Sequence, residues 1–219
     1  MELFGKIFPK ALLFGMLLCI ASCSPNYLKD FKLLNNSDLK IPTIFNHDFQ
    51  KSLYKAKLTI RGRELSGVLI VKRINKSGFR IVFMSEIGLK YFDFGIEYGG
   101  EEFMARTYYI MPVLNRGEAR DILINDFSLL LSDFKANRKP VVYRSAESKR
   151  IAVEYNYNGQ VYICFRQSGS DRIGAVKWKS RAGGRSGINI GSFPDGIPSG
   201  IEITNKKYSL FLKLQLIEQ

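Results

Sequence analysis

Histidine and long apolar segments are scarce in this sequence, and their absence excludes several classes of protein. The only histidine is His47, which has no cysteine or second histidine near it. The sequence therefore predicts neither a metal site nor a Ser-His-Asp triad, because both need histidine among other functional groups. Beyond residue 22, no run reaches the roughly 20 apolar residues of a membrane-spanning helix.

One apolar run does occur, over residues 11–22, directly after Lys6 and Lys10. A short apolar run behind basic residues is the layout of an export signal. Its 12 residues are too few for a permanent membrane anchor, which takes roughly 20 in a helix. We therefore predict a signal peptide over residues 1–22.

The signal ends in Ile20-Ala21-Ser22-Cys23, which resembles the lipobox of bacterial lipoproteins. The resemblance implies cleavage before Cys23 and a diacylglyceryl group on its sulfur, whereas an ordinary signal would leave Cys23 as a free thiol. Ser24, rather than an aspartate, comes next. In the enterobacterial sorting rule this implies the outer membrane, facing the periplasm. Residues 23–50 are then expected to be a lipidated cysteine and a tether.

Cysteine is also too scarce for a disulfide framework. Of the three cysteines, Cys19 lies in the signal and Cys23 is the expected lipidation site, so only Cys164 remains. Cys164 lies in the apolar segment VYICFRQ, where a thiol is expected to pack as a small hydrophobic side chain. We do not expect it to act as a nucleophile.

Charge of one sign is abundant. Removal of the signal takes away Glu2, Lys6 and Lys10, which leaves 31 basic and 19 acidic residues and a net charge of +12. Nucleic acid, anionic lipid headgroups or lipopolysaccharide, and an acidic protein all fit such a charge. Export makes nucleic acid the least expected of these partners. A basic surface without a specific partner is the alternative.

Beyond residue 50, short segments rich in Val, Ile, Phe and Tyr alternate with clusters of Gly, Asn, Asp, Ser and Lys. This pattern is typical of an antiparallel all-β domain. The clearest hairpin turn is Asn158-Gly159, since both of its positions require positive φ. We expect one domain over residues 51–219, with strands near 53–61, 64–74, 77–85, 89–98, 102–111, 140–144, 149–157, 160–167, 172–180, 185–191, 197–204 and 207–217.

Only residues 116–135 have a helical pattern. Apolar residues recur there at three- and four-residue steps and form one stripe, made of Ala119, Ile122, Leu123, Phe127, Leu130, Leu131 and Phe134. Polar residues are expected to occupy the opposite side, namely Asp121, Asn125, Ser128, Ser132 and Asp133. Such a helix needs an apolar surface to cover, which a curved sheet supplies.

The strand patterns differ from one another. In LKYFDFGIEY, one face holds Phe92 and Phe94, and the other holds Asp93 and Glu97, so we expect a strand that is wet on one side. GVLIVKRI and FRIVFM are apolar on both faces, which places them in the middle of a sheet. A large curved sheet with one helix could keep an apolar cavity, or these side chains could simply fill a core.

The order of elements along residues 53–217 is a hairpin region, LTIRGRELSGVLIVKRINKSGFRIVFMSEIGLKYFDF, then the helix, then the ending IPSGIEITNKKYSLFLKLQLIE. This order and these segments resemble the LolB family of outer-membrane lipoprotein receptors, which shares a half-barrel fold with the carrier LolA. The resemblance implies a mainly β fold: an antiparallel curved sheet, or half-open β-barrel, of about eleven strands with one main covering α-helix.

The resemblance also implies a concave face that holds lipoprotein acyl chains, without a cofactor and without breaking a bond. By position, the family's protruding loop residue falls at Ile87, followed by Gly88, and is implied to reach toward the membrane. An inward-turned Ile87 that caps the core is the alternative. The side chains expected to line the cavity are Leu69, Val71, Ile81, Phe83, Phe92, Phe94, Phe127, Leu130, Leu212 and Leu214.

Two functions stay open at this point. The first is a membrane-anchored lipoprotein that binds acyl chains or lipidated proteins and assists lipoprotein localisation to the outer membrane. The second is a structural or assembly lipoprotein of the envelope that binds anionic lipid, lipopolysaccharide or a partner protein through its basic surface. An enzyme is not expected, because Asp93, Glu97, Glu101 and Glu102 are ordinary surface carboxylates in this interpretation. The sequence leaves the oligomeric state open.

Overall fold

The structure is a computed structural model of the chain. It describes residues 27–34, 43–99, 102–116, 118–132, 140–157, 160–167, 169–179 and 184–218. The predicted signal peptide, the lipidation site Cys23 and the predicted turn Asn158-Gly159 lie outside the described residues.

A single 13-stranded sheet dominates the fold, in the order β1-β7-β8-β9-β10-β11-β12-β13-β2-β3-β4-β5-β6. All neighbours are antiparallel. The strands are β1 (Phe31–Leu33), β2 (Lys51–Ile60), β3 (Arg63–Arg73), β4 (Gly78–Met84), β5 (Lys90–Gly99), β6 (Glu102–Ile110), β7 (Val141–Ser145), β8 (Ile151–Tyr157), β9 (Gln160–Arg166), β10 (Ile173–Lys179), β11 (Arg185–Ile190), β12 (Gly200–Asn205) and β13 (Leu210–Glu218).

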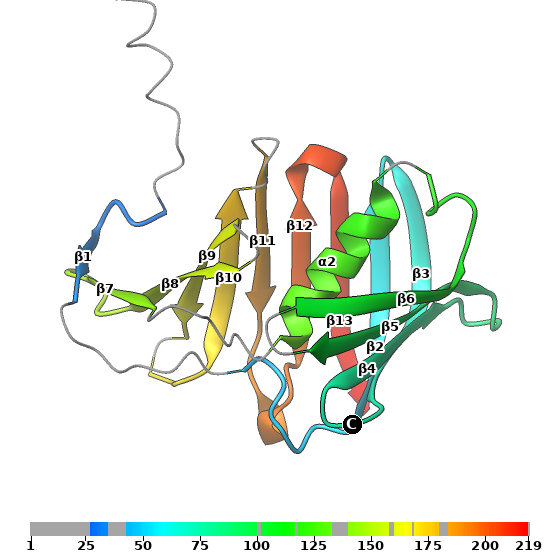
Figure 1. Cartoon of the computed structure of the whole chain (residues 1–219), viewed down its shortest axis with the longest axis horizontal. Helices are drawn as coiled ribbons and strands as arrows, with labels where there is room; N and C mark the ends of the chain where they lie inside the picture. Colours follow the sequence, from blue (N-terminus) through cyan, green and yellow to red (C-terminus); the bar gives the residue numbers. More distant parts are fainter. Residues whose placement is uncertain are drawn as a thin grey trace, which may run out of the picture.

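The sheet consists of two meanders that join in its middle. Strands β2 to β6 form one meander and β7 to β13 the other, and the last strand β13 pairs with the first strand β2. The sheet curves without closing, so β1 and β6 are its two edges (Figure 1). The predicted curved antiparallel sheet is confirmed. Each of the predicted strand ranges holds one strand, but the sheet has 13 strands instead of about eleven.

Alternation along the strands separates a concave apolar face from a convex polar one. In β2, Tyr54, Ala56 and Leu58 are buried, whereas Lys55 and Lys57 between them are exposed. Successive side chains of a strand point to opposite faces, so this pattern fixes which face each residue occupies. The buried set continues across the sheet through cross-strand pairs such as Leu58 with Leu212, Leu69 with Phe83 and Phe83 with Phe92.

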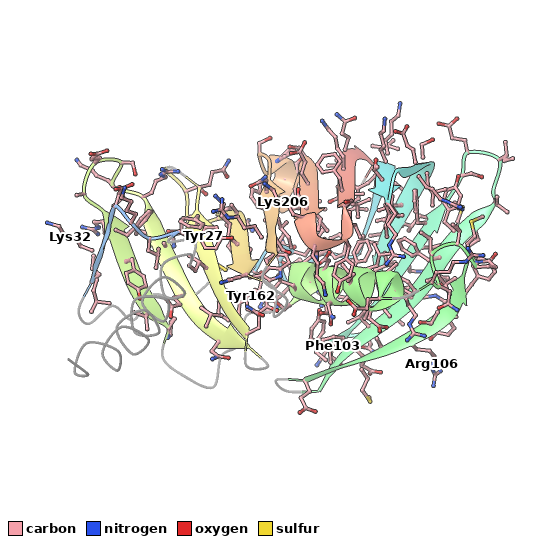
Figure 2. The ribbon with its side chains drawn as sticks, turned by 90° about the horizontal axis from the view of Figure 1, so that it is seen from above. Tyr27, Lys32, Phe103, Arg106, Tyr162 and Lys206 are labelled. Carbon is pink, nitrogen blue, oxygen red and sulfur yellow. The ribbon has the colours of Figure 1, made fainter. Side chains whose placement is uncertain are left out.

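One α-helix, α2 (Ala119–Leu131), is present among the described residues, and it lies across the concave face (Figures 1 and 2). The helix is more deeply buried than its pattern predicts. Asp121 and Asn125 are exposed as expected, but Ser128 and Ser132 are buried. Their hydroxyls donate to the carbonyl oxygens of Asn125 and Leu129, so the helix itself satisfies them and burial is tolerated.

The described part of the expected tether packs against the domain. Phe31 in β1 pairs with Ser145 in β7 and lies edge-to-face with the ring of Phe165. Further along, Ile44, Phe45 and Phe49 are buried in the main core. Two short 3-10 helices lie at opposite ends of β12: η2 (Pro194–Gly196) connects β11 to β12, and η3 (Lys206–Tyr208) connects β12 to β13 (Figure 1). None of the helices in the described ranges is long and apolar enough to cross a membrane.

Candidate functional site: the concave face and its rims

The structure brings the ten predicted cavity residues together. All of them belong to one hydrophobic cluster between the sheet and α2, and none is more than 1% exposed. Aromatic rings dominate its centre: Phe92 lies 4.6 Å from Phe94, 5.5 Å from Phe83 and 5.8 Å from Phe127 on α2, measured between ring centroids. The cluster is a continuous apolar interior, and its role as a ligand cavity stays a prediction.

Helix α2 is held over this interior at both of its ends. Near its start, Lys207 Nζ of η3 lies 3.4 Å from Glu118 Oε2. In its second half, the Tyr98 hydroxyl of β5 donates to the carbonyl oxygen of Ser128. These two contacts connect the helix to η3 and β5, and apolar packing against the sheet adds to them.

Asp126 is a charged residue type on the buried side of α2. Only 4% of it is exposed, and its Oδ2 has no hydrogen-bond partner. Burial raises the pKa of this carboxyl to about 8. Asp126 lies three residues after Leu123 and four before Leu130, so its position on the apolar stripe could have identified it from the sequence.

Ile87 lies on the loop between β4 and β5 and is 92% exposed. The inward-turned alternative is therefore wrong. The loop is closed by hydrogen bonds from the Ser85 amide to the Leu89 carbonyl and from the Leu89 amide to Ser85 Oγ, and Gly88 adopts a left-handed conformation with φ of 83°. A tight loop of this kind presents Ile87 to solvent.

Gly67 of β3 allows the loop to approach the sheet closely. A Cβ atom at Gly67 would lie 2.0 Å from the carbonyl oxygen of Met84 and 2.7 Å from Cα of Ser85. No side chain fits there. The position of the Ile87 loop therefore depends on a glycine in the neighbouring strand.

Asp93 differs from the prediction of an ordinary surface carboxylate. It points to the convex face, as the strand pattern predicts, but is only 2% exposed. Arg80 Nε and Nη2 donate to its two oxygens at 2.6 and 3.0 Å, and Lys90 Nζ lies 2.9 Å from Oδ2. Burial would raise the pKa of Asp93, but the hydrogen bonds and charges of Arg80 and Lys90 outweigh it and lower the pKa. Tyr108 of β6 covers the Arg80 guanidinium at 3.8 Å.

Two other residues of chemically reactive types are Cys164 and His47. Cys164 is buried and free, and burial raises the pKa of its thiol, which keeps it protonated. His47 is exposed, and the described residues hold no group of three or more possible metal ligands. None of the ten predicted cavity residues lines either of two surface hollows of about 400 and 360 Å³.

The comparisons with known proteins concern the fold. No family profile and no curated protein sequence matches the chain. Among solved structures, it is similar to a LolA superfamily protein from Nitrosomonas europaea, with a TM-score of 0.52 and 10% identity over 81% of this chain and 87% of that one.

A protein of the DUF1329 family from Desulfovibrio piger has a TM-score of 0.52 and 8% identity, over 78% of this chain and 85% of that one. A third similar structure is described as a putative outer membrane lipoprotein-sorting protein domain from Vibrio parahaemolyticus, with a TM-score of 0.49, 9% identity, and coverage of 77% of this chain and 84% of that one. At these identities the likeness concerns architecture, and the chain has a LolA/LolB-like half-barrel fold.

Proposed function

We propose that this protein is a lipid-anchored lipoprotein of the bacterial envelope that binds acyl chains or lipidated proteins between its sheet and α2, and so assists lipoprotein localisation to the outer membrane. The observation that supports it is the apolar interior of the half-barrel, in which all ten predicted residues meet beneath one helix. No cofactor and no bond cleavage enter this function. Cys23 would carry the anchor.

An acyl chain has to displace α2 from part of the sheet, and the energetics allow this. Each buried methylene contributes about 0.8 kcal/mol, so a chain of about 14 carbons gains on the order of 10 kcal/mol. Opposing this are the apolar contacts of the helix, such as Phe127 against Phe92, together with its polar contacts to Lys207 and Tyr98. The acyl chain would replace the apolar contacts of the helix with apolar contacts of its own. The net free-energy cost of displacing the helix is therefore small.

Ile87 is proposed to enter the membrane when the cargo is released. One branched side chain that moves from water into an apolar phase gains about 1.5–3 kcal/mol. Ile87 is suited to this because it is exposed on a short, hydrogen-bonded loop, so the backbone is ordered before contact. Leu89, which is half exposed on the same loop, would add to the effect.

The binding step is tested with a synthetic lipopeptide that carries acyl chains and with the same peptide without them. The protein used is the chain from residue 24 onward, which contains every described element. Trp178 is the only tryptophan and lies in the concave core, so its fluorescence reports on binding. We expect saturable binding of the acylated peptide alone. Equal binding of both peptides, or of neither, would refute the proposal.

The release step has a matched control in the chain. Ile87→Glu should leave lipopeptide binding in solution unchanged but reduce transfer to vesicles at least tenfold. Ile74→Glu, at another exposed apolar residue that follows β3, should change neither step. If both variants transfer equally well, Ile87 has no role at the membrane.

A further inference from the structure

We propose that the basic upper rim of the half-barrel is a docking surface for a bilayer that contains anionic phospholipids. The upper rim consists of Arg61, Arg63, Lys179, Arg185, Lys206 and Lys207, at the strand ends along the upper edge of Figure 1. This inference rests on the proposed function only in placing the protein at a membrane. It adds the surface and the class of lipid.

The rim is continuous across strands that are far apart in the sequence. Lys179 and Arg185 are directly paired at the ends of β10 and β11. Gly184, beside Arg185, lies against η3, since a Cβ atom there would be 2.9 Å from Cβ of Lys207. On the other side of η3, the Arg61 amide donates to the carbonyl oxygen of Ser209 at 3.4 Å. Figure 2 looks down on this rim, with Lys206 labelled near its middle.

The charges of the rim are largely uncompensated. All its members are exposed, and among the described residues no ion pair involves Arg61, Arg63, Lys179, Arg185 or Lys206. Lys207 alone is paired, with Glu118. The nearby acidic residue Glu64 is paired with Lys57 on the convex face. The rim therefore presents a row of cations to solvent.

The spacing of the row suits an extended array of anions. Neighbouring strands lie about 4.8 Å apart, so the rim from β10 to β3 extends across roughly 20–25 Å. No cation of the rim is buried, so none is held in a closed pocket that would select one small ion. Phosphates on a bilayer surface form such an array, and basic segments are attracted to them.

An apolar element accompanies the cations and distinguishes a bilayer from nucleic acid. β3 begins at the rim with Arg63, and four residues further along, at Gly67, it contacts the loop that carries the exposed Ile87 and Leu89. Four strand residues span about 13 Å, so these aliphatic side chains lie to one side of the rim. Cations combined with exposed aliphatic side chains are typical of surfaces that bind membranes at the headgroup level. Nucleic acid would instead favour cations interleaved with exposed aromatic side chains.

The test compares two variants that each remove three positive charges, one at the rim and one away from it. The rim variant is Arg61→Gln, Arg63→Gln and Lys206→Gln. The control variant is Lys51→Gln, Lys55→Gln and Lys72→Gln, at exposed residues of β2 and β3 that are not at the rim and have no ion pair among the described residues. Both are made in the chain from residue 24 onward, without lipid on Cys23.

Binding is measured by co-sedimentation with phosphatidylcholine vesicles that either lack or contain about 30% phosphatidylglycerol. We expect binding only to the anionic vesicles, a loss of about 100-fold for the rim variant at low salt, and at most a few-fold loss for the control variant. Inorganic phosphate at constant ionic strength should not compete, which separates a bilayer from a free-phosphate site. Equal losses in both variants would overturn the inference.

Two further outcomes also contradict the inference: rim-dependent binding of duplex DNA, or of an acidic polypeptide, that is tighter than binding to anionic vesicles.

Failure of the proposed function is distinguishable from failure of this inference. The rim variant should still take up the acylated lipopeptide, with the Trp178 signal of the unmodified chain. A protein that binds anionic vesicles through the rim but takes up no lipopeptide would keep this inference and lose the proposed function.

Discussion

The half-barrel has the upper rim and, at the opposite strand ends, a lower rim, where β3 ends at Arg73 and β9 ends at Arg166. The two rims use arginine in different ways. At the lower rim, Arg73 donates to the carbonyl oxygens of Phe49, Asn46 and Lys76, and its guanidinium lies 4.4 Å from the centre of the Phe79 ring. At the upper rim, Arg61 and Arg63 are exposed and without an ion pair among the described residues. Arg73 at the lower rim therefore holds the fold together, whereas Arg61 and Arg63 at the upper rim are available for a partner.

The lower rim also holds other cations in place. Arg166 Nη1 lies 2.7 Å from Asp171 Oδ1, and the Arg172 guanidinium lies 5.3 Å from the centre of the Phe193 ring. The comparison teaches that net charge alone does not identify a binding surface. What matters is which cations the fold already uses.

The largest expected effect is at the lower rim. Phe49→Ala should destabilise the protein by about 3–5 kcal/mol, because Phe49 is buried and its ring contacts those of Phe45 and Phe79. Urea denaturation followed by Trp178 fluorescence measures the change. Leu33→Ala, at an exposed side chain of β1, is the control and should stay within about 0.5 kcal/mol. A loss below about 1 kcal/mol at Phe49 would mean that residues 43–50 are not part of the folded unit.

Arg73→Ala should have the next largest effect, a loss of about 2 kcal/mol, because three carbonyl oxygens lose a charged donor. Arg73→Lys should recover only a small part, since an ammonium cannot reach all three carbonyls. Arg63→Ala at the upper rim should change the free energy of unfolding by less than about 0.5 kcal/mol. Similar losses at both arginines would remove the distinction between the rims.

Asp126 lies on the helix that runs between the rims, and its effect depends on pH. Its pKa is about 8 in the folded protein and near the ordinary value of 3.8 when unfolded. The unfolded chain therefore releases this proton at lower pH than the folded protein, so the contribution of Asp126 to stability is present below pH 4 and is lost as the pH rises toward 8.

Asp126→Asn removes this titration. Relative to the unmodified protein, the variant should gain at least about 1 kcal/mol between pH 5 and pH 8, or about 2–4 °C in Tm, measured by thermal unfolding at both values. Asp121→Asn, at an exposed position of the same helix, is the control. If the difference in Tm between Asp126→Asn and the unmodified protein is the same at both pH values, the Asp126 carboxyl is ionised in the folded protein at both.

The smallest effect is expected at the one paired cation of the upper rim. Glu118→Gln removes the ion pair with Lys207, whose two side chains are 62% and 33% exposed. Exposed pairs contribute little, so the loss should be at most about 0.5 kcal/mol and should vanish at 1 M salt. The same change adds one uncompensated cation to the rim, so binding to anionic vesicles should strengthen slightly. Weaker binding would argue against the rim as the docking surface.

Much of the fold was predictable from local pattern. The period of two in segments such as YSLFLKLQL predicts a strand with one buried face, and β13 has Leu210, Leu212 and Leu214 buried as expected. The apolar stripe of residues 116–135 predicts the helix, and α2 begins and ends within that range. These signals are local, because the periodicity of a strand or a helix is visible within its own segment of the sequence.

The residues whose surroundings the sequence pattern did not predict all depend on contacts between distant segments. Asp93 looks like a surface carboxylate within LKYFDFGIEY, but Arg80 of the neighbouring strand binds both of its oxygens, and Tyr108 of the edge strand covers the Arg80 guanidinium. Phe49 looks like part of a tether, but the ring of Phe79 lies beside it. A single strand pattern does not show what packs on its polar face.

By itself, the sequence determined which segments beyond residue 50 are strands, which one is the helix, which face of strands such as β2 and β13 is apolar and that the chain is basic, because periodicity and composition are local properties. Only the tertiary structure decided that the ten apolar residues meet beneath α2, that Ile87 points outward and that the cations of three separate hairpins form one rim. The reason is physical: sheet pairing joins residues more than a hundred positions apart, and that pairing follows from the packing of the whole chain.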